Sequence, residues 1–137
     1  VHRNVANVVY QTDLNCLSVL QFAVEVLRVE HIVVCGHYGC GGVSSAIDNR
    51  RHGLIDNWLR QIRQTATTHE EELSGLADAD KVDRLCELNV VTNVNNIAQT
   101  TIVEDAWRQG QELQIHAWIY RLTTGRIKTL QESLSGE

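Results

Sequence analysis

A histidine and a cysteine stand three positions apart within a glycine-rich segment of this chain, residues 34–42, which read VCGHYGCGG. Imidazole nitrogen and thiolate sulfur are both good ligands for Zn²⁺. The cysteine also stands where a helix is expected to begin, and a helix N-terminus favours the thiolate form of a cysteine. His37 and Cys40 are therefore candidate metal ligands, but two ligands alone do not complete a zinc site.

Other functions are compatible with the same residues. The glycines around the pair allow a sharp turn that can cradle a phosphate, but neither the dinucleotide-binding fingerprint nor a P-loop lysine accompanies them. Cys40 could instead be the nucleophile of a thiol hydrolase with His37 as its base, which requires an orienting Asn or Asp that the sequence does not place. The simplest alternative is a glycine turn with a buried cysteine and a partly exposed histidine.

The glycine-rich segment is expected to join a strand to a helix. Residues 32–34 form an apolar run of Ile and Val directly before it, which is typical of a parallel strand buried on both faces. A short helix is predicted over residues 40–49. Before the strand, a helix is predicted over residues 14–29, because Asp13 can cap it and apolar residues then recur every three or four positions.

The rest of the chain continues this alternation. Helical periodicity covers residues 54–66 and 81–109, and the polar stretch between them is interpreted as a surface connection. From Glu112 the apolar period changes to two, which predicts a strand that a turn at residues 123–125 joins to a last strand at 126–130. Residues 1–10 are interpreted as the end of a strand followed by a loop.

Strands that alternate with helices predict an α/β fold with a mainly parallel β-sheet flanked by helices. A length of 137 residues fits a single domain over residues 1–137. Ligands of such folds bind at the carboxyl ends of the strands, where the glycine-rich segment stands.

Charge and composition exclude several classes of partner. The net charge is -5 and the basic residues are scattered, which argues against nucleic acid as a partner. No apolar run reaches the roughly 18 residues of a membrane span, and no secretory signal opens the chain. The four cysteines are too few and too irregularly spaced for a disulfide framework, so a cytoplasmic location is expected, with core thiols or ligands at Cys16, Cys35, Cys40 and Cys86.

Several motifs resemble those of β-class carbonic anhydrases, and the bacterial members most of all. Residues 32–42 resemble the second metal motif of that class. Residues 2–7, 86–90 and 115–120 resemble further signatures in the expected order, so the resemblance covers essentially the whole chain. It implies a β-carbonic anhydrase-like fold, Zn²⁺ as cofactor and the reversible hydration of carbon dioxide to bicarbonate and a proton. It also implies a homodimer or homotetramer.

In that family zinc is held by two Cys, one His and, in the closed form, an Asp. His37 and Cys40 match the later two ligands. The others belong to a Cys-x-Asp-x-Arg motif that precedes the segment matched by residues 2–4, and this sequence begins after it. We therefore expect an N-terminally truncated chain that binds zinc weakly or not at all, and we assign no catalytic residue because the Asp-Arg pair is missing. A non-catalytic remnant of the fold is the alternative.

The resemblance also implies a second, regulatory site. In bacterial relatives, residues matching Arg3 and Tyr120 resemble part of an inhibitory bicarbonate pocket, and an arginine can bind such a planar anion through two parallel hydrogen bonds. The alternative is that Arg3 is an ordinary ion-pair partner and Tyr120 an aromatic residue of a strand. The remaining histidine and tryptophan residues of interest are interpreted as core or interface residues: His2, His116, Trp58, Trp107 and Trp118.

Overall fold

The computed structural model describes residues 1–136, and its centre is a four-stranded sheet. β1 (His31–His37) and β2 (Gln114–Arg121) pair in parallel along their length. β3 (Arg126–Thr129) and β4 (Leu134–Ser135) both pair with β2 in the antiparallel direction. The predicted α/β fold with parallel strands flanked by helices is confirmed, and the antiparallel strands make the sheet mixed.

Period-two alternation decides which face of β2 is buried. Its apolar set, Ile115, Ala117 and Ile119, is fully buried, whereas the alternate side chains remain partly exposed. The antiparallel hairpin from β2 to β3 turns at the residues that the sequence predicts. Both predictions are confirmed because a strand with one buried face leaves a clear pattern in the sequence.

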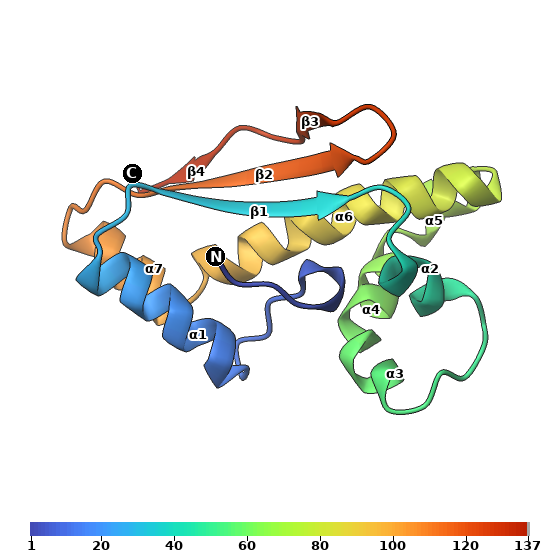
Figure 1. Ribbon diagram of the computed structural model, residues 1–137, viewed down its shortest axis with the longest axis horizontal. Helices are drawn as coiled ribbons and strands as arrows, with labels where there is room; N and C mark the ends of the chain where they lie inside the picture. The colour runs from blue at the N-terminus through green and yellow to red at the C-terminus, as the bar shows by residue number, and fades with distance from the viewer. Residues whose placement is uncertain (137) are drawn as a thin grey trace.

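The helices gather on one face of the sheet (Figure 1). The longest of them, α6 (Asp78–Ala98), packs against both β1 and β2. Within residues 1–136, no helix combines the length and apolarity that crossing a bilayer requires. The remaining helical elements are η1 (Val5–Asn7), α1 (Leu14–Gln21), η2 (Phe22–Val26), α2 (Gly41–Ile47), α3 (Ile55–Trp58), α4 (Arg60–Thr68), α5 (Glu70–Ser74) and α7 (Thr101–Arg108).

The opposite face of the sheet is open. Val33 is 40% exposed, whereas its neighbour Val34, which faces the helices, is 6% exposed. The prediction that this strand is buried on both faces is therefore wrong for the described chain. No helix of residues 1–136 covers this face, so only one side of the apolar run reaches a core.

The predicted helix over residues 81–109 is two helices. The first ends at Ala98, and Thr100 caps α7, because its Oγ1 accepts a hydrogen bond from the Val103 backbone N–H at 3.3 Å. The apolar period continues through this break, which is why the periodicity alone does not reveal it. The predicted helix over 54–66 is likewise divided into α3 and α4 at Leu59.

Three further predictions need correction. The polar stretch predicted as a surface connection contains α5, whose Leu73 is buried. The helix predicted over 14–29 is α-helical only to Gln21 and then continues as the π-helical turn η2. The opening segment forms the 3₁₀ turn η1 rather than the end of a strand.

Three asparagines of α6, here named the asparagine anchor, hold the N-terminal segment against the core. Asn89 Nδ2 donates to the Ala6 carbonyl at 2.8 Å, and Asn96 Nδ2 donates to the Val9 carbonyl at 3.0 Å. Asn93 Oδ1 accepts from the Val9 backbone N–H at 2.6 Å. The anchor satisfies backbone groups that no sheet or helix partner would satisfy, and so brings the N-terminal segment beside β1.

Candidate metal centre

The metal loop, residues 37–40, joins β1 to α2. His37 is the last residue of β1, and Cys40 is the residue that precedes the first turn of α2. The backbone N–H of Tyr38 donates to the Tyr120 carbonyl at 3.0 Å, which keeps the loop beside β2. The structure thus places both predicted ligands at the carboxyl end of a parallel strand, where a ligand site is expected.

The hydrogen bond of the His37 ring determines which nitrogen is free. Its Nδ1 lies 2.9 Å from the Tyr38 carbonyl oxygen. Because a carbonyl can only accept, Nδ1 must carry the proton, and Nε2 of the neutral ring keeps its lone pair. A metal-binding histidine is commonly oriented in this way by a backbone carbonyl.

The glycines around Cys40 allow close packing and an unusual backbone conformation. Gly39 has a φ of +70°, which L-residues with side chains rarely adopt. A Cβ on Gly36 would lie 2.5 Å from Cγ2 of Val90, and one on Gly42 would lie 3.0 Å from Cβ of Ala6. A side chain at Gly36 would press against α6, and one at Gly42 would press against η1. Close packing therefore explains these two glycines, and no bound phosphate is needed to explain them.

The donor types at the metal loop suit zinc, but the donor number is incomplete. Residues 1–136 contain no group of three or more His, Cys, Asp or Glu side chains that could hold a metal ion. His37 and Cys40 by themselves are fewer than the three or four protein donors that zinc sites use.

The other cysteines are not placed as metal ligands. Cys16 and Cys86 are buried in the core, Cys86 beside Cys40, and burial raises the pKa of the Cys86 thiol to about 11. These two are core thiols, as predicted. Cys35 is exposed on the open face of the sheet, so the expectation that every cysteine is a core thiol or a ligand is wrong there.

An open groove of about 970 Å³ runs along β1 and the N-terminal segment. Arg3, His37 and Tyr120 all line it. Among residues 1–136 no carboxylate lies within ion-pair distance of Arg3, and no hydrogen bond joins Arg3 to Tyr120. The two residues of the predicted bicarbonate pocket therefore line the same groove as His37, with no hydrogen bond between them.

The same groove contains a strained and unsatisfied polar residue. Nδ2 of Asn7 is buried and has no hydrogen-bond partner within the described part of the chain. Ala6 and Asn7 also have φ values of 64° and 44°, in the left-handed region. Buried donors are rarely left unpaired, so Asn7 is an exception among the described residues.

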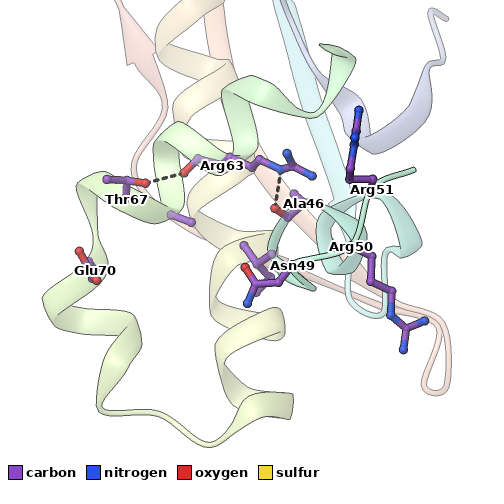
Figure 2. Close-up of a pocket in the computed structure, with 9 residues that line it drawn as sticks. Ala46, Asn49, Arg50, Arg51, Arg63, Thr67 and Glu70 are labelled. Atoms are coloured by element: carbon purple, nitrogen blue, oxygen red, sulfur yellow. Dashed lines mark hydrogen bonds between the residues drawn. The ribbon is translucent and has the colours of Figure 1, made fainter. Parts of the chain in front are cut away.

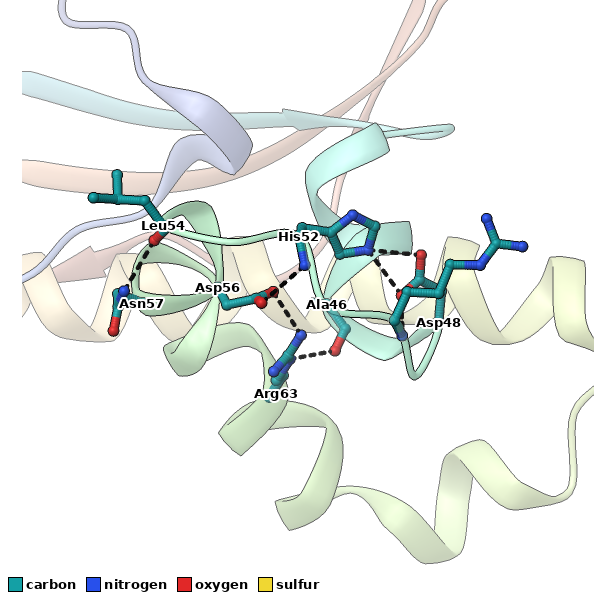
Figure 3. Close-up of polar contacts among 8 residues, drawn as sticks. Ala46, Asp48, His52, Leu54, Asp56, Asn57 and Arg63 are labelled. Carbon is teal, nitrogen blue, oxygen red and sulfur yellow. Dashed lines mark hydrogen bonds and ion pairs between the residues drawn. The ribbon is translucent and has the colours of Figure 1, made fainter.

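A second pocket, of about 590 Å³, lies at the other end of α2 from Cys40 (Figure 2). Arg63 Nε donates to the Ala46 carbonyl there at 2.8 Å. Figure 3 shows that Asp56 accepts from both Arg63 and the His52 backbone N–H, each at 2.9 Å. These groups satisfy one another and close the loop after α2, so we assign them a structural role.

Sequence reasoning missed one group beside the metal loop. The Tyr38 hydroxyl donates to Glu87 of α6 at 2.5 Å, and Arg84 and Lys128 also donate to this carboxylate. Burial, with this hydrogen bond, raises the pKa of Tyr38 to about 12. Burial alone would raise the pKa of Glu87, but the three donors hold it below its ordinary value. The sequence does offer a signal that Glu87 matters, because this residue lies in one of the motifs described above, residues 86–90.

The tryptophans and histidines predicted as core or interface residues are all only partly buried. Trp58 Nε1 donates to the Val5 carbonyl and Trp107 Nε1 to the Leu113 carbonyl. His2, His116 and Trp118 are partly exposed, and His116 lies 3.1 Å from the His31 ring nitrogen. These contacts are structural within the described chain.

Comparisons with known proteins agree with this geometry. A sequence model of the family described as "Carbonic anhydrase" matches residues 1–127. The carbonic anhydrase of Emericella nidulans is 40% identical over 137 residues, covering 99% of this chain and 60% of that protein. The Coccomyxa β-carbonic anhydrase in complex with acetazolamide has a TM-score of 0.95 at 36% identity, covering 98% of this chain and 62% of that one.

One of two tetrameric β-carbonic anhydrases from Sordaria macrospora has a TM-score of 0.90 at 34% identity, covering 97% of this chain and 68% of that one. A bacterial relative from Pseudomonas aeruginosa is 32% identical, so identity does not single out the bacterial members. The chain spans about three fifths of the length of the first two relatives. With the family model matched over most of its length and the metal loop in place, the chain belongs to the β class of the carbonic anhydrase family.

Proposed function

We propose that the protein carrying this chain catalyses the reversible hydration of carbon dioxide to bicarbonate and a proton, with Zn²⁺ held in part by His37 and Cys40. The observation that carries the proposal is the metal loop itself. It presents an imidazole whose Nδ1 is bound to a backbone carbonyl and a buried thiol at one strand-to-helix turn. Membership of the carbonic anhydrase family supports the choice of reaction.

Each residue of the metal loop has a defined task in this proposal. When bound, zinc supplies the Lewis acidity that lowers the pKa of a water ligand to about 7. His37 donates Nε2, because the Tyr38 carbonyl holds its Nδ1 proton. Cys40, which is 5% exposed, would donate its sulfur from a buried position.

Ligand substitutions test the proposal. His37→Ala and Cys40→Ser should each abolish zinc retention and carbon dioxide hydration, measured by metal analysis and stopped-flow assay on the same preparation. Cys16→Ser and Cys86→Ser are the matched controls, which should keep the metal and lose stability by roughly 0.5–3 kcal/mol. Retained zinc and activity in His37→Ala would exclude this assignment.

The thiol hydrolase alternative has weaker support. Its base would need an orienting Asn or Asp side chain, whereas Nδ1 of His37 is bound to a backbone carbonyl. A metal chelator should leave a thiol hydrolase active and should inactivate a carbonic anhydrase. A folded chain that neither takes up added zinc nor hydrates carbon dioxide would instead identify a non-catalytic remnant.

We also propose that the chain forms a homodimer or homotetramer. Large apolar side chains of α1 and η2 are exposed, among them Phe22 and Val26, and the open face of the sheet adds Val33. The Sordaria macrospora relatives are described as tetrameric. Val26→Asp should shift the sedimentation coefficient towards that of a monomer, while Glu25→Gln on the same turn should not.

A regulatory bicarbonate pocket at Arg3 and Tyr120 is a further proposal, supported by their position on one groove. Arg3→Ala should weaken inhibition by bicarbonate, with zinc content unchanged. A charge-assisted hydrogen bond contributes about 1.5–3 kcal/mol, so the half-inhibitory concentration should rise about tenfold or more. An unshifted inhibition curve with a lower melting temperature would favour the structural alternative.

The cytoplasmic location stays a prediction from the cysteine pattern. The four cysteines are free, and Cys35 presents an exposed thiol, which suits a reducing compartment. Subcellular fractionation with detection of the native protein would test it.

A further inference from the structure

Tyr38 separates the two proposed metal ligands in the chain, and it is held at three points. Its backbone N–H donates to the Tyr120 carbonyl at 3.0 Å. The guanidinium carbon of Arg121 lies 4.0 Å from the centroid of its ring, a cation–π contact. Its hydroxyl donates to Glu87 at 2.5 Å. The side chain therefore fastens the middle of the metal loop to β2 and α6.

Glu87 is the residue that joins these contacts. Its side chain is 13% exposed, and both carboxylate oxygens are used. Oε1 accepts from the Tyr38 hydroxyl and from Lys128 of β3 at 3.1 Å, while Oε2 accepts from Arg84 at 2.8 Å. Charge-assisted hydrogen bonds of this kind are the stronger ones, so the carboxylate is itself firmly placed.

The neighbouring backbone cannot supply this rigidity. Gly39, Gly41 and Gly42 surround Cys40, and glycine has the greatest conformational freedom of any residue. An added Cβ at Gly39 or Gly41 would meet no atom within 4 Å, so packing does not confine these positions. The loop needs a fixed point of its own, and Tyr38 is the residue that provides one.

The fixed point lies next to a proposed ligand. The Tyr38 carbonyl is the acceptor that binds Nδ1 of His37 at 2.9 Å and thereby selects the tautomer with a free Nε2. A continuous path therefore runs from the Glu87 carboxylate through the Tyr38 side chain and carbonyl to the His37 ring. No residue of the path other than His37 is a metal donor in the proposed function.

We propose that Tyr38 and Glu87 are positioning residues: Glu87 holds Tyr38, and Tyr38 orients the His37 ring. The same contacts of Tyr38 fix the position of Cys40 in the loop, so that the imidazole and the thiolate are presented together. The proposal rests on the proposed function, because it concerns the same pair of metal donors. Substituting residues that support metal ligands from behind typically lowers metal affinity about 10- to 100-fold.

The test compares Tyr38→Phe, Glu87→Gln and the double variant in the protein that carries this chain. Tyr38→Phe keeps the ring and its contact with Arg121 and removes only the hydroxyl. Zinc alone is the probe, with its affinity measured by competition against a chromophoric chelator. Each single variant should bind zinc about tenfold more weakly, and the double variant should be no weaker than the weaker single variant, since both act through one contact.

A second readout does not depend on metal. Nitrogen-15 NMR of the metal-free chain reports the His37 tautomer, which should be the Nδ1–H form in the original sequence and a mixture in both variants. Thr100→Ala is the control, because it removes the α7 cap at the far end of the sheet from the metal loop (Figure 1). It should lower stability and leave zinc affinity and tautomer unchanged.

Unchanged zinc affinity and an unchanged tautomer in Tyr38→Phe would overturn the proposal. If Glu87→Gln fails to fold, Tyr38→Phe alone decides. If the original protein takes up no zinc, the proposed function fails, while the tautomer comparison still supports or overturns the positioning role. The two failures are therefore distinguishable.

Discussion

Helix α6 binds two segments of the chain through different kinds of polar contact. The asparagine anchor binds the N-terminal segment through neutral amides, and its central member, Asn93, is 0% exposed. Glu87 precedes all three asparagines on the same helix and binds the metal loop through a carboxylate shared among three donors, at the edge of the solvent. One anchor is uncharged and buried, and the other is ionic and partly hydrated.

The difference shows how burial decides the kind of polar contact that a site can use. A neutral amide can be buried without the large desolvation cost of an ion, provided that each of its groups is paired. An ionised carboxylate needs several donors even at 13% exposure, and Glu87 has them. We therefore expect the asparagine anchor to dominate stability and the Glu87 contacts to dominate the geometry of the metal loop.

The largest effect should follow from Asn93→Ala. The change removes the acceptor of the Val9 N–H and of Gln61 Nε2 and leaves both donors unpaired. Each unsatisfied buried group costs about 1–3 kcal/mol, so the free energy of unfolding should fall by about 3 kcal/mol. Urea unfolding measures this. A loss no larger than that of Glu87→Gln would contradict the comparison.

A smaller effect is expected at Gly36, between the two anchors. Gly36→Ala places a Cβ against Val90 of α6, at 2.5 Å from its Cγ2. Overpacking of this kind costs typically about 1–3 kcal/mol. Adding Val90→Ala should restore part of the loss, measured as a coupling energy in the double variant. Additive losses would show that the contact with α6 is not the cause.

Glu87→Gln should cost less, about 1–2 kcal/mol at neutral pH, and its cost should depend on pH. The pKa of Glu87 is held below its unfolded value of 4.5, so its contribution is present above that pH and is lost as the pH falls through the folded pKa. The stability difference between the two proteins should therefore shrink below about pH 4.5 in urea unfolding series. Asn93→Ala should show no such dependence on this group, and a constant difference for Glu87→Gln would contradict the ionic assignment.

The smallest effect should come from Asp83→Asn. Asp83 pairs with Arg121 at 3.4 Å, and both side chains are well exposed. Exposed ion pairs contribute about 0–1 kcal/mol, and the loss should vanish in high salt. Thermal unfolding at low and high ionic strength would measure it. A loss as large as that of Glu87→Gln would show that Arg121 fixes the Tyr38 ring more strongly than the Glu87 hydrogen bond does.

Local patterns in the sequence are sufficient for much of the architecture. Alternation along β2 identifies its buried face, and the turn before Arg126 identifies the hairpin, because both are recorded within a few neighbouring residues. The positions of His37 and Cys40 at a strand-to-helix turn follow from the same local reasoning. The cap at Thr100 cannot be predicted from such local patterns, because it breaks the helix without changing the apolar period. The open face at Val33 cannot be predicted either, because its exposure depends on what covers the sheet.

Motifs and periodicity alone identify the donor types at the metal loop, the strand and helix that flank them, and the family to which the motifs belong. Only the tertiary structure decided which nitrogen of His37 is free and that Glu87 holds the residue between the two donors. The physical reason is distance along the chain. Glu87 is 49 positions from Tyr38, and periodicity and spacing report on neighbours within a turn or a strand, whereas a hydrogen bond across the fold depends on how α6 and β1 pack.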